Sequence, residues 1–432
     1  MTVGGSEVNK IILYVIIAPL ILGLVACAQP VSGEIIKSDK PRDTSPSVST
    51  VDLSTLVEGN SDFAFDLYQA VKGTDGNLFY SPYSISLALA MTYAGARSET
   101  EQQMADTLHF ILSQDNLHPA FNALELELAS RGEGAKGKDD EGFRLNIVNA
   151  IWGQKDYSFL AAFLDTLAEN YGAGLRTLDF IKAPEESRIT INNWVSDQTE
   201  GRIEDLIPQG LISSMTRLVL TNAIYFNAAW EHPFTEEATE DGSFYLLDGG
   251  EVVVPMMKQT ESFGYGEGNG YQAVELPYDG GELSMVILLP ASGEFEAFED
   301  SLEARQVDDI IAGLKSRRVT LTMPKFEFDS SFSLKETLAA MGMPDAFNGQ
   351  SADFSGMTGN RDLFIGEVVH QAFVSVDEAG TEAAAATAVM MNLTSMPGEP
   401  VKVTIDRPFI FLIRDIETGA ILFVGRVMNP SA

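Results

Sequence analysis

Apolar and polar residues recur along most of the chain with the periods of helices and strands. From Asn60 onward, behind Asn60 or Ser61 as a candidate helix cap, Phe63, Leu67 and Ala70 recur at helical spacing. Residues 84–93 are mostly apolar and uncharged and predict a buried helix that starts at Ser81-Pro82. Two further stretches have the amphipathic pattern of surface helices, residues 160–171 and 187–199. Strands buried on both faces are predicted at residues 218–226, 283–289, 319–328, 363–376, 409–413 and 421–427. Because no linker-like break interrupts this alternation, the pattern predicts one α+β domain over residues 56–432.

The first 26 residues have the pattern of an export signal. Residues 11–25 form an apolar run without a charge, shorter than the roughly 20 residues that a membrane-spanning helix needs. The run ends in Leu-Val-Ala-Cys, residues 24–27, which resembles the lipobox of bacterial lipoproteins. That resemblance implies cleavage before Cys27 and attachment of lipid to this cysteine. An uncleaved anchor helix is the alternative.

Residues 27–55 are rich in Ser, Pro, Thr, Asp and Lys and show no apolar periodicity. This composition predicts a disordered tether between the lipid anchor and the domain. We therefore expect an exported protein that is held in the cell envelope and faces the extracellular or periplasmic space.

Charge and cysteine content exclude several classes of partner. The chain has 432 residues, with 28 Lys and Arg against 62 Asp and Glu, a formal net charge of −34. Such a surface repels phosphate backbones and heparin-like polyanions, so neither nucleic acid nor heparin is an expected partner. Its one cysteine and four scattered histidines form no zinc-binding pattern, and neither a metal nor another cofactor is expected.

The sequence contains none of the common catalytic motifs. A nucleophile elbow, a zinc-protease helix, a phosphate-binding loop and a dinucleotide-binding turn are all missing. A serine nucleophile would need a histidine base, and only His370 lies inside a strongly apolar strand pattern, where a structural histidine of the core is expected. We therefore do not expect an enzyme.

Residues 380–393 (GTEAAAATAVMMNL) do not fit their surroundings. Alternation puts one uncharged set on a common face, from Thr381 through Ala383 and Ala385 to Leu393. Four consecutive alanines have poor strand propensity, and no tight turn is predicted to join this piece to a hairpin partner. The segment resembles a strand that enters a sheet from outside, and an alanine-rich surface helix is the alternative. Two prolines make the following stretch, residues 394–400, a candidate for proteolysis.

This arrangement resembles the serpins, and the resemblance extends from about residue 60 to residue 430. It is carried by seven motifs in the family's order. They are residues 77–84 (NLFYSPYS), 220–226 (LTNAIYF) with 230–234 (WEHPF), 254–257 (VPMM), 323–326 (MPKF), 369–370 with 377–386 (DEAGTEAAAA), 406–409 (DRPF) and 425–430 (GRVMNP). Each motif is weak alone, but their order makes the resemblance specific.

The resemblance implies a fold with three β-sheets, about nine helices and an exposed reactive loop near residues 379–400. It also implies suicide inhibition, in which a target serine protease forms an acyl-enzyme with the loop and the loop then inserts into the main sheet. A non-inhibitory serpin-fold protein of the envelope remains the alternative. We expect a monomer whose partner is the target protease.

The resemblance also assigns roles to residues. Counting sixteen residues on from Glu378 gives Thr394-Ser395 as the cleaved bond, with Leu393-Thr394 and Met391-Asn392 as alternatives. No Lys or Arg occurs between Thr381 and Val401, so the expected target resembles elastase, subtilisin or chymotrypsin and not trypsin. The loop hinge comprises Glu378, Gly380, Thr381, Ala383, Ala384, Ala385 and Ala386, and the residues expected to control sheet opening are Ser81, Ser84, Asn222, His370 and Trp230.

Overall fold

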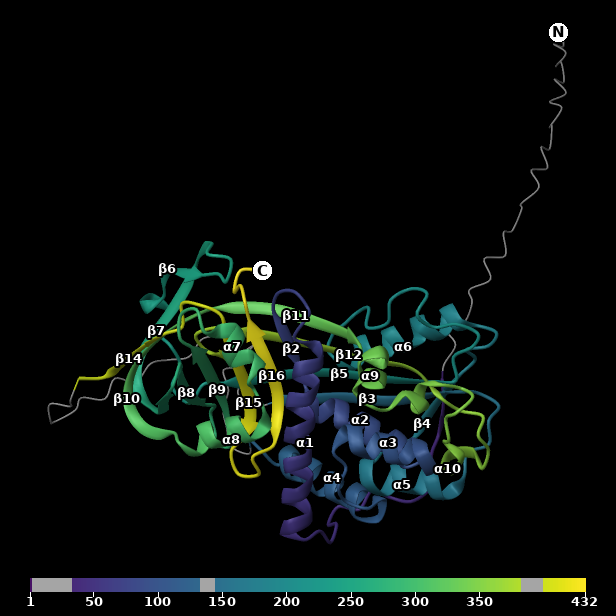
Figure 1. Cartoon of the computed structure of the whole chain (residues 1–432). Coiled ribbons are helices and arrows are strands. Elements are labelled where there is room, and N and C mark those ends of the chain that lie inside the picture. The colour runs from purple at the N-terminus through teal and green to yellow at the C-terminus, as the bar shows by residue number, and fades with distance from the viewer. Residues whose placement is uncertain (2–32, 133–143, 382–398) are drawn as a thin grey trace. The chain divides into compact units, whose positions relative to one another are not determined.

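Ten α-helices and sixteen strands form in the described part of the chain (Figure 1). A computed structural model describes Met1 and residues 33–132, 144–381 and 399–432. The helices are α1 Thr50–Val71, α2 Pro82–Tyr93, α3 Ser98–Leu108, α4 Gln114–Ala129, α5 Ala161–Tyr171, α6 Pro184–Gln198, α7 Phe295–Asp300, α8 Ala304–Ala312, α9 Lys335–Met341 and α10 Ser355–Thr358, with 3-10 helices η1 Glu236–Ala238 and η2 Pro344–Phe347. The strands are β1 Glu34–Ile36, β2 Leu78–Tyr80, β3 Arg144–Gln154, β4 Leu175–Leu178, β5 Leu218–Ala229, β6 Glu240–Tyr245, β7 Glu251–Gly268, β8 Tyr271–Pro277, β9 Leu283–Pro290, β10 Lys315–Pro324, β11 Phe326–Ser333, β12 Ile365–Val376, β13 Gly380–Thr381, β14 Val401–Thr404, β15 Phe409–Asp415 and β16 Ile421–Val427.

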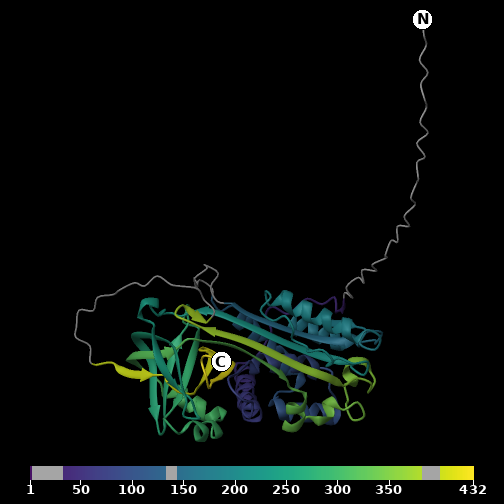
Figure 2. The same ribbon diagram turned by 90° about the horizontal axis from the view of Figure 1, so that it is seen from above.

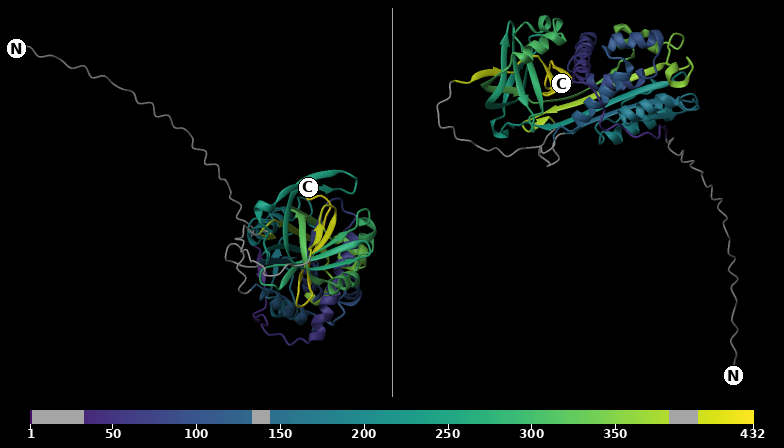
Figure 3. Two further views of the ribbon diagram at one scale, coloured as in Figure 1. Left: turned by 90° about the vertical axis from the view of Figure 1, so that its left-hand side faces the viewer. Right: turned by 90° about the horizontal axis from the view of Figure 1, so that it is seen from below.

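The strands form two mixed sheets. A seven-stranded sheet has the order β1-β4-β3-β5-β13-β12-β11, and a nine-stranded sheet has the order β14-β10-β7-β8-β9-β15-β16-β2, with β6 beside β7. The left view of Figure 3 shows the curved strands of the nine-stranded sheet. Hydrogen bonding thus joins two of the three expected sheets into one through the 18-residue strand β7. This strand pairs with β6 over residues 251–256, with β10 over residues 256–265 and with β8 over residues 264–268.

The seven-stranded sheet lies between two helical layers with separate apolar clusters. On one face, Val148, Ala150 and Trp152 of β3 pack against Ile191 and Val195 of α6. The larger cluster lies on the other face and contains side chains of α1, α2, α4 and α5. Figure 1 shows α6 and α2 on opposite sides of these strands. The central strands are therefore buried on both faces, which is why they read as nearly continuous apolar runs.

Two predicted elements need correction at their boundaries. Helix α1 begins at Thr50, well before Asn60, because the side chain of Ser49 accepts a hydrogen bond from the backbone N–H of Asp52 and caps it. The single strand predicted over residues 319–328 is two strands, β10 and β11, which separate at Lys325 and belong to different sheets.

The prediction of a disordered tether is wrong for residues 33–55. Strand β1 pairs antiparallel with β4 at the edge of the seven-stranded sheet. Further on, the Arg42 guanidinium donates to the side chains of Asn122, at 2.8 Å, and Glu125, at 3.0 Å, both on α4. The backbone N–H of Asp43 donates to the carbonyl of Glu169 on α5. The composition of this segment is that of a linker, but the domain supplies enough polar partners to fix it.

We predict that Arg42→Met lowers the midpoint of thermal unfolding. Burial raises the pKa of Glu125 while Arg42 lowers it, so the substitution removes the group that favours the charged carboxylate. The expected loss is about 1–3 kcal/mol, as for a partly buried charge without its partner. Lys40→Met is the matched control on the same segment, because the Lys40 side chain is 48% exposed and its ion pairs with Asp165 and Glu169 should contribute little. Equal midpoints for Arg42→Met and Lys40→Met would contradict this account of residues 33–49.

No helix within the described residues is both long and apolar enough to cross a bilayer.

Candidate functional site

The chain reverses direction in a tight turn immediately after β12. The carboxylate of Asp377 accepts hydrogen bonds from the backbone N–H groups of Ala379, at 2.8 Å, and Gly380, at 3.3 Å. The N–H of Asp377 donates to the carbonyl of Gly380 at 3.0 Å, and Val376 then pairs with Thr381. The expectation that no tight turn joins this segment to a hairpin partner is therefore wrong. The sequence signal was Asp377 itself, since an aspartate side chain stabilises turns by accepting from the next backbone N–H groups.

The two residues that follow this turn already form a strand inside the main sheet. Strand β13 pairs with β12 on one side and with β5 on the other, where Gly380 lies opposite Ala229 and Thr381 opposite Ala228. Strands β5 and β12 pair directly with each other only from Leu218 and Ile365 up to Tyr225 and Phe373. Figure 2 shows these two long strands side by side. The sheet is thus open at one end, and the hinge occupies the opening.

Space at the opening is very limited. A Cβ atom added to Gly380 would lie 2.1 Å from the carbonyl oxygen of Ala228, so the backbone can approach β5 only at glycine. The Thr381 side chain is fully buried, and its hydroxyl lies 2.8 Å from the hydroxyl of Tyr278. Burial raises the pKa of Tyr278 far above its ordinary value, so the phenol stays neutral. The sequence pattern predicts that the side chain of Thr381 points inward, and its complete burial agrees with that prediction.

Trp230 covers the open end of the sheet. Its indole N–H donates to the carbonyl of Asp377 at 3.0 Å, and its backbone N–H donates to the carbonyl of Ala379 at 2.9 Å. Its ring stacks on Tyr278 with 4.7 Å between ring centroids and 9° between the planes. Trp230 therefore holds the turn through two hydrogen bonds, and Tyr278, on which its ring stacks, contacts Thr381.

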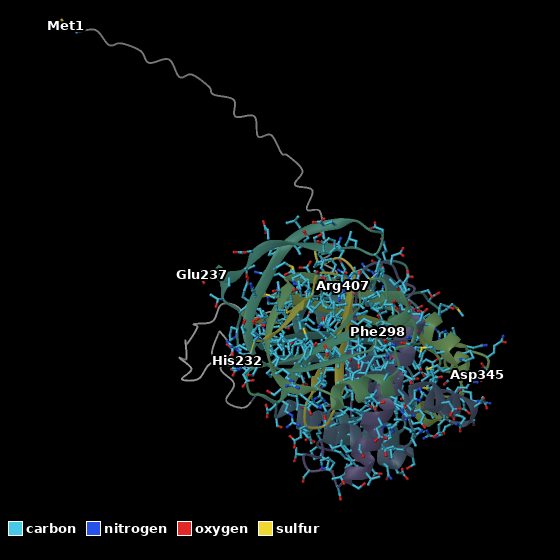
Figure 4. The ribbon with its side chains drawn as sticks, turned by 60° about the vertical axis from the view of Figure 1, so that its left-hand side comes forward. Met1, His232, Glu237, Phe298, Asp345 and Arg407 are labelled. Carbon is cyan, nitrogen blue, oxygen red and sulfur yellow. The ribbon has the colours of Figure 1, made fainter. Side chains whose placement is uncertain are left out.

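Glu378 fixes the turn to the neighbouring loops. One carboxylate oxygen accepts from Lys325 Nζ at 2.7 Å and the other from the Thr239 hydroxyl at 2.7 Å. Burial raises the pKa of Glu378, but these hydrogen bonds outweigh it and hold the pKa below its usual range. Its carbonyl also accepts from the N–H of Phe234. Phe234 and Thr239 lie in the connection between β5 and β6. Figure 4 labels His232 and Glu237 of this connection at one margin of the molecule, and Asp345 at the opposite margin.

Four of the five residues expected to control sheet opening form one hydrogen-bonded cluster: Ser81, Ser84, Asn222 and His370. The backbone N–H of Ser81 donates to His370 Nε2 at 3.2 Å, and the other ring nitrogen lies against the side-chain oxygen of Asn222. The Asn222 amide donates to the Ser84 hydroxyl. Burial lowers the pKa of His370 to about 3, so the imidazole is neutral at pH 7. The cluster joins α2 to β5 and β12 where the two strands still pair.

Sequence reasoning missed one member of this cluster. The side-chain oxygen of Asn149 on β3 accepts from the Asn222 amide and from the Ser84 hydroxyl, and its own amide donates to the carbonyl of Ser84. The only local signal was an asparagine between the apolar residues Val148 and Ala150, because a polar side chain at a partly buried position needs partners. Ser84 is hydrogen-bonded to Asn149 and not to His370, so the cluster contains no nucleophile paired with a base.

Several predicted site residues lie outside the described residues. These are Ala383 to Ala386 of the hinge, the expected cleaved bond Thr394-Ser395 and the lipid attachment site Cys27. Within the described ranges, no group of three or more His, Cys, Asp or Glu side chains could hold a metal ion. The described part of the site therefore consists of two hinge residues, Gly380 and Thr381, which pair between β5 and β12 at the end where those strands part.

Comparison with known proteins agrees with this geometry. Residues 58–430 match the family described as "Serpin (serine protease inhibitor)". An uncharacterised serpin-like protein of Thermococcus kodakarensis is 42% identical over 400 residues, which cover 90% of this chain and 91% of that protein. Human leukocyte elastase inhibitor is 40% identical over 389 residues, covering 88% of this chain and 100% of the inhibitor. The native structure of the thermophilic serpin tengpin superposes with a TM-score of 0.81 at 29% identity, covering 92% of this chain and 100% of tengpin. The predicted serpin fold is confirmed, the family is one of protease inhibitors rather than enzymes, and the chain is a member of the serpin family.

Proposed function

We propose that this serpin inhibits serine proteases as a suicide substrate. The protease's serine attacks the carbonyl of Thr394, an ester forms between them, and the peptide that begins at Ser395 leaves. The segment after Thr381 then enters the sheet between β5 and β12 and carries the attached protease away from its original position. Distortion of the protease traps the ester before water hydrolyses it.

Strand β13 is the observation that carries this proposal. A loop that inserts must first reverse direction at the end of β12 and then pass between two strands. The turn from Asp377 to Gly380 has made the reversal, and Gly380 and Thr381 already pair on both sides. Further insertion exchanges the direct β5–β12 pairs for pairs with the new strand, so each broken backbone hydrogen bond is replaced. The uncharged face that starts at Thr381 supports the same process, because a charged side chain would have to lose its hydration.

The proposal is tested by the kinetics of protease inactivation. Trypsin-, chymotrypsin-, elastase- and subtilisin-type proteases are each incubated with increasing amounts of the protein, and their residual activity is measured over time. We expect progressive, irreversible loss of activity at about one molecule of serpin per molecule of at least one protease. Cleavage of the serpin with full retention of protease activity would instead support a non-inhibitory envelope protein.

We predict that the inhibited proteases have a small or apolar specificity pocket. A trypsin-type pocket carries a carboxylate that selects Lys or Arg, and the first basic residue after Thr381 is Lys402, in strand β14. Mass spectrometry of the released C-terminal peptide should find Ser395 as its first residue. A peptide that begins at Thr394 would move the bond to the alternative Leu393-Thr394, which suits a chymotrypsin-type pocket. Rapid inactivation of trypsin with cleavage after a basic residue would contradict this assignment.

We further propose that the protein is a monomer anchored to a membrane of the cell envelope through lipid on Cys27. The support is the apolar run of residues 11–25 and the residues 24–27 that resemble a lipobox. Cys27→Ser is expected to leave an unprocessed precursor without lipid, which N-terminal sequencing and membrane fractionation would detect. Unchanged processing and membrane association of Cys27→Ser would contradict the proposed anchor.

A further inference from the structure

Arg176 on β4 is a partly buried cation that packs against two tryptophan rings. Its guanidinium carbon lies 4.4 Å from the ring centroid of Trp194 and 5.4 Å from that of Trp152. Burial lowers the pKa of Arg176, and no neighbouring carboxylate offsets that effect. Among the described residues none forms an ion pair or side-chain hydrogen bond with this guanidinium. In a chain with a net charge of −34, a stacked arginine without an acidic partner is unexpected.

Arg176 lines a cavity of about 400 Å³. Arg176 and Lys37 supply its two charged side chains, and no Asp or Glu belongs to its lining. Met91 and Tyr171 form an apolar part of the wall, and the amide of Gln198 lies at another part.

The cavity also borders an unpaired edge of the main sheet. Strand β3 pairs with β5 from Arg144 to Gly153, but on its other side only residues 152–154 pair with β4. Residues 147–151 of β3 line the cavity. In an antiparallel pair, alternate N–H groups point away from the partner strand. Within the described part of β3, those N–H groups are available as further donors at the cavity.

We propose that this cavity binds a small organic anion, with its oxyanion on Arg176 and Lys37 and its apolar body against Met91 and Tyr171. The guanidinium carbon lies over the ring of Trp194, and the ring of Trp152 stands at 77° to that ring. Neither ring accepts a conventional hydrogen bond, so the N–H groups of Arg176 can still donate to a carboxylate. The apolar part of the wall favours a carboxylate with a hydrocarbon or aromatic body over a bare inorganic ion. The site is distinct from the loop hinge, and its test does not depend on protease inhibition.

The binding test uses the whole protein and its own fluorescence. Two of its three tryptophans, Trp152 and Trp194, flank Arg176 and should report occupancy of the cavity. Benzoate, octanoate and inorganic phosphate are titrated separately at constant ionic strength, and isothermal calorimetry repeats each titration. We expect saturable binding of benzoate or octanoate and weaker binding of phosphate. Tight binding of phosphate alone would contradict the preference for an organic anion with an apolar body. If no probe binds saturably at millimolar concentration, the proposed anion site itself is wrong.

Substitutions then assign the binding to this cavity. Arg176→Met is expected to weaken carboxylate binding about tenfold or more, because it removes the planar pair of donors. Lys37→Met removes the second cation at an exposed position and should weaken binding by a smaller factor without disturbing the fold. Arg318→Met, an exposed arginine on β10, is the matched control and should bind as wild type does. Wild-type affinity in both Arg176→Met and Lys37→Met, or an equal loss in Arg318→Met, would refute the site.

Discussion

Replacing Thr381 by arginine is expected to turn this serpin from an inhibitor into a substrate. The Thr381 side chain is fully buried between β5 and β12, with its hydroxyl against Tyr278, and nothing there can receive a guanidinium. Burial of an unpaired charge costs several kcal/mol, on the order of 3–5 in proteins. The hinge should therefore leave the sheet and re-enter it slowly, while the protease still cuts the loop.

The yield of covalent complex measures this effect. We expect about a hundredfold loss in the rate of complex formation in Thr381→Arg, the equivalent of about 2.7 kcal/mol, with cleavage of the loop retained. Thr404→Arg is the matched control, because Thr404 is an exposed residue of strand β14. If Thr381→Arg forms complex as fast and as fully as the wild type, the inward-facing set that begins at Thr381 has been assigned to the wrong face.

The second large effect is a loss of stability in mild acid. Burial lowers the pKa of His370 to about 3 and that of His118 to about 4, against an ordinary value of 6.5. Below pH 6.5 the unfolded chain binds protons on these imidazoles and the folded chain does not. The free energy of unfolding is therefore not reduced by these histidines above pH 6.5, and it decreases as the pH falls below that value. The loss continues until the folded pKa of each histidine is reached. Between pH 7 and pH 5 the two together should cost roughly 4 kcal/mol of unfolding free energy.

Unfolding midpoints measured from pH 7.5 to pH 4.5 check this prediction. His118→Gln removes one of the two titrations. It should therefore reduce the number of protons taken up on unfolding near pH 5 by about one, which lowers the slope of the unfolding free energy against pH. His118 suits the test because its ring contacts the Tyr171 hydroxyl, at 2.6 Å, and lies outside the cluster of His370. His232→Gln changes an exposed histidine and serves as the control. A midpoint that stays constant down to pH 5 would contradict the assignment of both buried imidazoles as neutral.

Much of this fold could be predicted because its central strands are buried on both faces. Strands β9, β15 and β16 were found from continuous apolar runs, and β16 was found at its observed bounds, Ile421–Val427. The buried position of Thr381 followed from period-two alternation together with the lack of charge on its face. These features depend on local sequence, and the packing agrees with the local pattern.

The features that could not be predicted depend on partners distant in sequence. Thr381 and Tyr278 are 103 residues apart, and nothing near either one indicates their contact. Strand β1 has three residues and exists because β4, some way along the chain, offers an unpaired edge. The early start of α1 did have a local signal, Ser49 followed three residues later by Asp52, which resembles a capping box. The stacking of Arg176 on Trp194 had none.

The most direct test of the account is whether the protein and a protease become covalently joined through the loop. The protein is mixed with an elastase- or subtilisin-type protease, boiled in SDS and separated on a denaturing gel, with a protease lacking its catalytic serine as the control. The account predicts a band that contains both chains, its formation with active protease only, and release of a short C-terminal peptide. Complete conversion of the protein into two cleavage fragments without any joined band, beside fully active protease, would contradict it.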